Sequence, residues 1–302
     1  MIMPTESDAF RLNRHQVRNA FDRAAHTYDA AAVLQHEVGA RLMERLDLTT
    51  LTPARILDIG CGTGRATREL MRHYPGARVV AADFAPAMLR EVRRRFWFRR
   101  PALVCADAAG LPFADAGFEL VFSNLMLQWC DDLDASLREL RRVTAARGLL
   151  LFSTLGPDTL KELRAAWSEV DGATHVNGFV DMHDIGDALI RAGFVEPVMD
   201  VEHLTLTYED VFGLMRDLKR IGAHNVTEGR ARNLTGRERM RKLSAAYERA
   251  RRDGRLPATY EVVYGTAWTP AARVDAAYAD RSGGVSVERL RSSIKRRERS
   301  SG

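Results

Sequence analysis

The chain has 302 residues, 46% of them hydrophobic, which suits one large domain or one domain with an inserted subdomain. Its three cysteines, Cys61, Cys105 and Cys130, form no CxxC pair, so neither a disulfide framework nor a structural zinc site is expected. No apolar run approaches the roughly 20 residues of a membrane span, and charged residues interrupt the start of the chain, so we expect a cytoplasmic protein.

The formal net charge of +5 is concentrated in two segments. Residues 215–255 contain 13 Lys or Arg against 5 Asp or Glu, and residues 281–302 contain 7 against 2. The second segment is rich in Ser and Arg and is predicted to be disordered. The first lies in apolar, helix-like sequence, so it requires a different explanation.

Residues 10–47 show apolar side chains at three- and four-residue steps, which predicts helix. Further along, short apolar runs alternate with helix-like segments. Such runs are typical of parallel strands that are buried on both faces and joined by helices. The strands predicted here are residues 55–60, 78–83, 102–107, 118–124 and 148–154, with helices near 86–95 and 132–143.

The pattern changes after the fifth predicted strand. Helices are predicted at 157–170 and 184–192, followed by a strand near 197–207. Residues 209–253 are helical and basic, and the alternating β-branched and aromatic residues at 259–268 predict a closing strand. We therefore predict an α/β, Rossmann-like fold whose mostly parallel seven-stranded sheet has helices on both faces and a helical insertion before the last strand.

The segment DIGCGTG follows the first predicted strand and opens a helix, so a close approach of the backbone to a ligand is expected there. Its glycines are Gly60, Gly62 and Gly64. The dinucleotide fingerprint requires Gly at the first, third and sixth positions, and neither Gly60 nor Gly62 as a start gives that spacing. Asp58, on the strand before the first glycine, has no evident use in a phosphate-binding loop.

Three successive predicted strands carry a carboxylate at or near their ends, namely Asp58, Asp83 and Asp107. Asp58 can accept from an ammonium group, and Asp83 has about the spacing at which a carboxylate binds both ribose hydroxyls. Asp107 can accept from an adenine amino group. A ligand with an amine, a ribose and an adenine but no phosphate is S-adenosylmethionine. The alternative is that these are ordinary polar residues at strand ends.

In order along the chain, DIGCGTG, AADFAPAML, CADAAGLPF and FELVFSNLMLQW resemble the motifs of the class I S-adenosylmethionine-dependent methyltransferases. The resemblance implies S-adenosylmethionine as cofactor and S-adenosylhomocysteine as product, and the scattered His and Cys residues indicate no metal site. The cofactor contacts it implies are Asp58, Gly60, Cys61, Gly62, Gly64, Asp83, Phe84, Met88, Asp107, Ala108, Asn124 and Gln128.

The flanking segments resemble one family, the malonyl-acyl-carrier-protein O-methyltransferases of early biotin synthesis. The similar segments are FDRAAHTYDAAAVLQHEVG, STLGPDTLKELRAAW, HVNGFVDMHDIGDALIRAGF and LMRDLKRIGAHNVTEGR. A second family, the methyltransferase-like complex I assembly factors implicated in arginine hydroxylation, resembles the DTLKELR and PATYEVVY segments. A protein arginine hydroxylase is therefore the main alternative, and a methyltransferase of another small molecule is a lesser one.

Methylation of a carboxylate needs no general base, because the carboxylate has an ordinary pKa of about 4 and is already ionised near neutral pH. The enzyme must align the reacting atoms, exclude water and hold the carboxylate. The resemblance makes Arg164 and Tyr28 candidates for holding it. Lys161 and Arg164 share a helix face, and Tyr28 lies on an N-terminal arm that can close over the cofactor. The alternatives are a solvated surface arginine and an aromatic ring packed on the sheet.

The basic insertion suggests a protein partner. Acyl carrier proteins are small and acidic, so a helix carrying Arg216, Lys219 and Arg220 can steer association with a malonyl-loaded carrier. The alternative is a solvated basic helix face. No membrane partner is expected, and no nucleic acid either, because SNLMLQW after the fourth strand lacks the proline-containing motif that stacks an extruded base.

These assignments divide the chain into four parts. We expect an N-terminal helical arm or lid over residues 1–50 and a cofactor-binding core over 51–208 and 257–270. The basic helical cap is expected over 209–256, and the disordered tail over 271–302.

Overall fold

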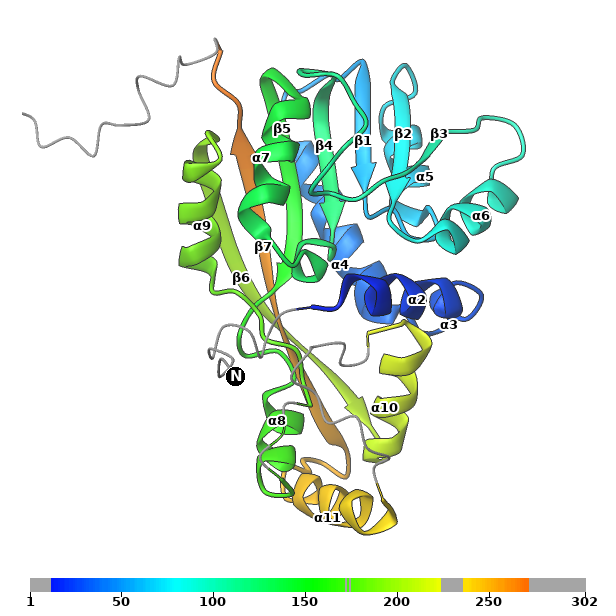
Figure 1. The fold of residues 1–302 in the computed structure, drawn as a ribbon, viewed down its shortest axis with the longest axis vertical. Coiled ribbons are helices and arrows are strands. Elements are labelled where there is room, and N and C mark those ends of the chain that lie inside the picture. Colours follow the sequence, from blue (N-terminus) through cyan, green and yellow to red (C-terminus); the bar gives the residue numbers. More distant parts are fainter. Residues whose placement is uncertain (1–11, 172, 174, 224–235, 272–302) are drawn as a thin grey trace, which may run out of the picture.

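The computed structural model describes residues 12–171, 173, 175–223 and 236–271 (Figure 1). Residues 224–235 of the predicted cap and residues 272–302 of the predicted tail lie outside these residues. Seven strands in the described part of the chain form one sheet with the order β3-β2-β1-β4-β5-β7-β6. The strands are β1 Arg55–Ile59, β2 Arg78–Asp83, β3 Ala102–Cys105, β4 Phe118–Asn124, β5 Thr144–Leu155, β6 Val195–Tyr208 and β7 Leu256–Trp268.

The sheet is parallel from β3 to β5, whereas β7 pairs antiparallel with both β5 and β6. This arrangement confirms the predicted Rossmann-like fold with its mostly parallel seven-stranded sheet. The central strands are apolar runs because both of their faces are buried: the whole of β1 after Arg55 is buried, as are Gly148–Thr154 of β5.

Helices cover both faces of the sheet. On one face lie α4 (Val33–Glu44), α5 (Arg65–His73) and α6 (Pro86–Arg95), and on the other lie α7 (Leu133–Val143) and α9 (Met182–Arg191). Each has an apolar stripe at helical spacing, such as Leu34, Val38 and Leu42 of α4, which are all buried in the core. Short 3-10 helices occupy Arg45–Leu48 and Leu127–Trp129.

Two N-terminal helices lie across the edge of the sheet where the parallel strands end (Figure 1). They are α2 (Arg14–Ala24) and α3 (Tyr28–Ala31), so the helix predicted over residues 10–47 is three helices. Asn13 caps α2 by accepting a hydrogen bond from the Gln16 amide.

The strands β6 and β7 continue past this edge and carry a second group of helices (Figure 1). These are α8 (Lys161–Ser168), α10 (Val211–Arg220) and α11 (Arg237–Glu248), of which the last two lie between β6 and β7 in the sequence. The side chains of Leu214 in α10 and of Leu243 and Tyr247 in α11 are buried. The ends of β1, β2 and β4 therefore lie between the two groups of helices and face α2, α8 and α10.

No helix in the described residues combines the length and the apolar character needed to cross a membrane.

Candidate active site

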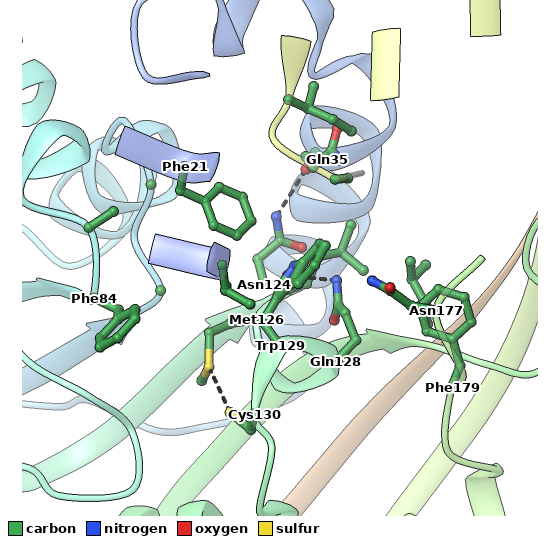
Figure 2. A pocket seen from close by; sticks show the side chains of 18 of the residues that line it. Phe21, Gln35, Phe84, Asn124, Met126, Gln128, Trp129, Cys130, Asn177 and Phe179 are labelled. Carbon is green, nitrogen blue, oxygen red and sulfur yellow. Dashed lines mark hydrogen bonds between the residues drawn. The ribbon is translucent and has the colours of Figure 1, made fainter. Parts of the chain in front are cut away.

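A cavity of about 380 Å³ lies where the parallel strands end (Figure 2). One end is lined by the glycine loop and by the ends of β2 and β4. The other end is lined by apolar side chains of α8 and α10, among them Leu163, Trp167, Met215 and Leu218. The cavity therefore connects the predicted cofactor region with the second group of helices.

The glycine loop adopts a backbone conformation that favours glycine, with φ of 73° at Gly60, 53° at Gly62 and 83° at Gly64. A Cβ atom at Gly60 would lie 2.4 Å from the Met126 side chain. Gly60 and Gly62 line the cavity as predicted. Gly64 does not line this cavity, and a Cβ on it would lie 3.0 Å from Val92 of α6, so close packing on α6 also favours glycine there. Its contact with the cofactor stays a prediction.

Asp83 is buried at the end of β2, with 9% of its surface exposed, and lines the cavity. Its carboxylate accepts hydrogen bonds from the amides of Gly62 and Ala85, both at 2.8 Å. Burial raises the pKa of Asp83 to about 6 despite these bonds. A carboxylate in this setting is suited to accept from ligand hydroxyls.

Asp58 lies on the other side of the glycine loop. It lines a second cavity, of about 530 Å³, which shares five lining residues with the first, namely Tyr28, Gln35, Gly60, Gly62 and Asn124. The hydroxyl of Thr67, in the first turn of α5, donates to the Asp58 carboxylate. Burial raises the pKa of Asp58 to about 7. The predicted ammonium partner would thus have to approach from this side of the loop.

Asp107 lines the first cavity beyond the end of β3, together with Ala108. Its carboxylate accepts from the Ala109 amide and forms an ion pair with Arg14 of α2, a partner that the sequence did not reveal. The arm is therefore tied directly to the predicted adenine end of the cavity.

The remaining predicted cofactor contacts divide between the two cavities. Phe84 and Met88 line the first, and Cys61 lines the second. Burial raises the pKa of the Cys61 thiol well above its usual value, so a nucleophilic thiolate is not favoured there.

Asn124 and Gln128 both line the first cavity, but each also ties structural elements together (Figure 2). The Asn124 amide donates to the Gln35 carbonyl of α4 and accepts from the Ser153 hydroxyl of β5. Gln128 donates to the Leu125 carbonyl and accepts from the Thr154 hydroxyl. Their roles as cofactor contacts stay predictions.

Tyr28 of α3 contributes to both cavities, and its ring faces Gly62. The neighbouring Asp29 fixes this position, because it accepts a 2.6 Å hydrogen bond from Thr63 of the loop and pairs with Arg95 of α6. Burial, together with Asp83 and Asp29, raises the pKa of the Tyr28 hydroxyl. Tyr28 is therefore a protonated hydrogen-bond donor near neutral pH, not a base.

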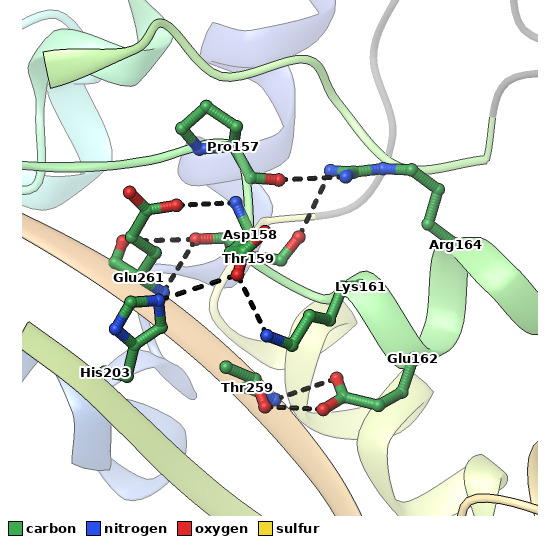
Figure 3. A network of polar contacts seen from close by, with 9 residues as sticks. All are labelled: Pro157, Asp158, Thr159, Lys161, Glu162, Arg164, His203, Thr259 and Glu261. Carbon is green, nitrogen blue, oxygen red and sulfur yellow. Dashed lines mark hydrogen bonds and ion pairs between the residues drawn. The ribbon is translucent and has the colours of Figure 1, made fainter. Parts of the chain in front are cut away.

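Arg164 and Lys161 do not line either of these cavities, although both were predicted to face the acceptor (Figure 3). The Arg164 guanidinium donates to the carbonyls of Pro157 and Thr159, and the Lys161 ammonium pairs with Asp158 at 2.9 Å. The physical reason is the orientation of α8, which turns Leu163 and Trp167 toward the cavity and leaves Arg164 on its exposed side.

Two glutamates connect the loop before α8 and the first turn of α8 to β7 (Figure 3). Glu261 accepts from the Asp158 amide at 2.6 Å, and Glu162 accepts from the amide and hydroxyl of Thr259. Asp158, His203 and Glu261 bring potential metal-ligand atoms within 4.8 Å of one another. Here the Asp158 carboxylate faces the Lys161 ammonium, and the network holds α8 in place.

The predicted partner residues Arg216, Lys219 and Arg220 are all exposed on α10. The opposite side of this helix presents Met215, Leu218 and Ile221 to the cavity. The helix is joined to the arm, because the Thr27 hydroxyl donates to the Arg220 carbonyl.

Several lining residues were not found from the sequence. They are Phe21 on α2, Trp167 on α8, Tyr260 on β7, and His175, Asn177 and Phe179 in the segment before α9. The segment 175–179 has no periodic pattern, so nothing in it indicated a position beside the cavity. Trp167 was indicated only as part of an amphipathic helix.

The strand order and the glycine loop followed by strand-end carboxylates define a class I S-adenosylmethionine-dependent methyltransferase. The sequence profile of the family described as "Methyltransferase domain" matches residues 57–152. A putative methyltransferase from Bacillus halodurans has the same fold, with a TM-score of 0.55 over 77% of this chain and 98% of that one, at 18% identity. The YcgJ protein of Bacillus subtilis gives a TM-score of 0.54 at 14% identity, over 76% of this chain and 98% of that one.

The chain belongs to the malonyl-[acyl-carrier protein] O-methyltransferase family. The protein of that name from Laribacter hongkongensis is 57% identical over 276 residues, which cover 88% of this chain and 93% of that protein. Those from Methylovorus sp. and Halorhodospira halophila are each 55% identical, over 89% and 86% of this chain and 93% and 90% of theirs. The resemblance seen in the motifs is thereby confirmed, and these relatives favour a carboxyl methyltransferase over the alternative arginine hydroxylase.

Proposed function

We propose that this protein transfers a methyl group from S-adenosylmethionine to the free carboxylate of a malonyl group carried by acyl carrier protein. The product is the methyl ester that primes pimeloyl synthesis for biotin in the family it belongs to. The observation that carries the proposal is the single cavity that runs from Asp83 and Asp107 to the apolar side of α10. It provides room for a cofactor and an acceptor in contact with each other.

The residues at the strand ends suit S-adenosylmethionine. Asp83 is a buried carboxylate with a raised pKa, and donors such as ribose hydroxyls would compensate its burial. The glycine loop allows the cofactor to contact the backbone at Gly60 and Gly62. The other proposed cofactor contacts are Gly64 of the loop and eight residues that line one of the two cavities, namely Asp58, Cys61, Phe84, Met88, Asp107, Ala108, Asn124 and Gln128. When bound, S-adenosylmethionine supplies an electrophilic methyl group.

The chemistry requires no proton transfer. A bond forms between a carboxylate oxygen and the methyl carbon, while the carbon–sulfur bond breaks and its electron pair stays on sulfur. Tyr28 is placed to donate a hydrogen bond to the acceptor beside the glycine loop. The arm helices α2 and α3 exclude water, which lowers the cost of aligning the reacting atoms. No metal is assigned a role.

The basic face of α10 is the proposed docking site for the carrier protein. Arg216, Lys219 and Arg220 are exposed, whereas Met215 and Leu218 on the same helix line the cavity. An acidic carrier bound at this face would hold its acyl arm near the apolar end of the cavity.

We also propose the division of the chain into the N-terminal arm, the cofactor-binding core, the basic helical cap and the C-terminal tail that the sequence predicts. The proposed location of the protein is the cytoplasm.

The test is a transfer assay. Purified protein, S-adenosylmethionine with a labelled methyl group and malonyl-acyl carrier protein should yield labelled carrier whose label is released by mild base. Acetyl-acyl carrier protein, which has no free carboxylate, is the matched control and should stay unlabelled. Normal binding of S-adenosylhomocysteine without any transfer to the malonyl carrier would refute the proposed acceptor.

A further inference from the structure

His175, in the segment between α8 and α9, lines the apolar end of the cavity. The ring is stacked face to face on Trp167, with centroids 3.6 Å apart and planes 9° from parallel. Its Nε2 atom lies 2.7 Å from the Asp171 carboxylate, and only 15% and 16% of the two side chains are exposed. Two contacts therefore fix the orientation of an imidazole at the edge of the cavity.

The Asp171 carboxylate is held as an anion. Burial acts to raise its pKa, but hydrogen bonds from His175 and the Ala173 amide and the nearby Arg239 guanidinium outweigh burial, so the pKa is lowered. An anion at Nε2 requires that this nitrogen carry a proton. If the ring is an imidazolium, Nδ1 is a second charged donor.

A carboxylate that enters this cavity needs a cation or several donors. Among the described residues that line it, the basic side chains are Arg14 and His175. Arg14 is paired with Asp107 at the opposite end, and Arg164 lies outside the lining. The side-chain amide of Asn177, 7% exposed as a residue, points toward Gln128 across the cavity in Figure 2. His175 thus has polar neighbours, and it is the side chain lining this end that carries a positive charge when protonated.

We propose that His175 is the residue that recognises the free carboxylate of the acceptor, with its imidazolium donating to the carboxylate from Nδ1. Asp171 is a positioning residue that holds the ring from behind, and Trp167 is the surface on which the ring lies. The inference rests on the proposed methylation of a malonyl group and names the specificity determinant of that site.

The experiment compares the dissociation constants of malonyl- and acetyl-acyl carrier protein in the presence of S-adenosylhomocysteine, which prevents turnover. The two ligands share the carrier and differ in the carboxylate. We expect the wild type to prefer the malonyl form by about tenfold or more, as a charge-assisted hydrogen bond in a partly buried site provides. In His175→Gln the malonyl affinity should fall to that of the acetyl form, with acetyl affinity unchanged.

Asp171→Asn should also reduce the preference for the malonyl form, but by less than His175→Gln does. The His175 ring stays in place in this variant and loses only the carboxylate that faces its Nε2 atom. Binding of S-adenosylhomocysteine and the melting temperature report folding for both variants, and a purely structural role would change both ligands alike. A His175→Gln protein that keeps the malonyl preference overturns the inference. So does a wild type that methylates the malonyl carrier without binding it more tightly than the acetyl carrier. A wild type that transfers no methyl group refutes the proposed function instead.

Discussion

At the scale of single residues, the two buried carboxylates beside the glycine loop give the cofactor site a dependence on pH. Burial raises the pKa of Asp83 to about 6 and that of Asp58 to about 7, against an ordinary value near 4. Without ligand, both groups are mostly protonated at pH 5 and mostly ionised at pH 8. Because their folded-state pKa values are raised, their contribution to stability is full below about pH 4 and is lost as pH rises through 6 and 7.

Cofactor affinity should change in the opposite sense. Hydroxyl and ammonium donors bind the ionised carboxylates, so the affinity for S-adenosylhomocysteine should increase by about tenfold or more between pH 5 and pH 8. Titration calorimetry in two buffers with different ionisation enthalpies should show proton release near pH 6. Asp83→Asn should remove the part of the increase that occurs near pH 6. An affinity that is constant across this range would show that neither carboxylate meets a donor of the ligand.

Arg164 illustrates a second residue-scale effect. Because its guanidinium donates to the carbonyls of Pro157 and Thr159, Arg164→Ala should loosen the loop before α8. For an exposed side chain this costs about 1 kcal/mol, or a few degrees in melting temperature, and should raise the KM for the malonyl carrier by less than about fivefold. Lys161→Ala is the matched control on the same helix. A loss of 100-fold or more in kcat/KM at unchanged melting temperature would place Arg164 on the substrate.

The sequence predicted the cofactor end of the site better than the acceptor end, for a physical reason. Carboxylates at successive ends of parallel strands meet at one edge whatever the rest of the fold does, so Asp83 and Asp107 could be placed from spacing alone. The direction of Arg164 depends on how α8 rotates against β7. His175 lies in a segment without periodicity, and its neighbours Trp167 and Asp171 become neighbours only in the folded chain.

At the scale of elements, α10 has two faces with separate tasks. Its apolar residues Met215, Leu218 and Ile221 line the cavity. At its end, a Cβ atom on Gly222 would lie 3.2 Å from the backbone of Ala20 on α2. The exposed face carries Arg216, Lys219 and Arg220. The amphipathic pattern and the concentration of charge were visible in the sequence, whereas the contact with α2 was not, because it joins segments about 200 residues apart.

Reversal of charge on α10 tests the docking face. Lys219→Glu with Arg220→Glu should raise the KM for malonyl-acyl carrier protein by about tenfold or more, because steering of an acidic partner is lost. Malonyl-pantetheine, which lacks the carrier, should be affected little. The control is Arg241→Glu with Lys242→Glu, an equal change of charge on the exposed face of α11. Equal effects of the two double variants, or equal effects on both substrates, would remove docking from α10.

At the scale of the whole molecule, one sheet joins the parallel strands β1 to β5 to the antiparallel strands β6 and β7. The parallel strands β1 to β5 could be predicted in order from their apolar runs. The position of β7 between β5 and β6 could not, because periodicity reports which residues are buried and not which strand lies beside which. The pairing buries Val262, Val263 and Tyr264 completely between β5 and β6, although β7 is the last of the seven strands in the sequence.

A truncation tests how far the fold depends on this strand. A chain that ends at Arg255 lacks β7, which removes the hydrogen-bond partner of both β5 and β6. We expect it to show no cooperative thermal transition and no binding of S-adenosylhomocysteine, whereas a chain that ends at Ala271 should show both. Wild-type affinity in the shorter chain would mean that the parallel strands fold alone.

The strand order also bears on the synthesis of the protein. While the chain emerges from the ribosome, β1 to β5 can pair as they appear, but the 14-residue strand β6 has no place in the sheet until β7 has followed it. During that interval the nascent chain exposes two strand edges, one on β5 and one on β6, and such edges promote aggregation. Strand β7 pairs with both of these edges. The acceptor half of the cavity can therefore form only after β7 has been synthesised.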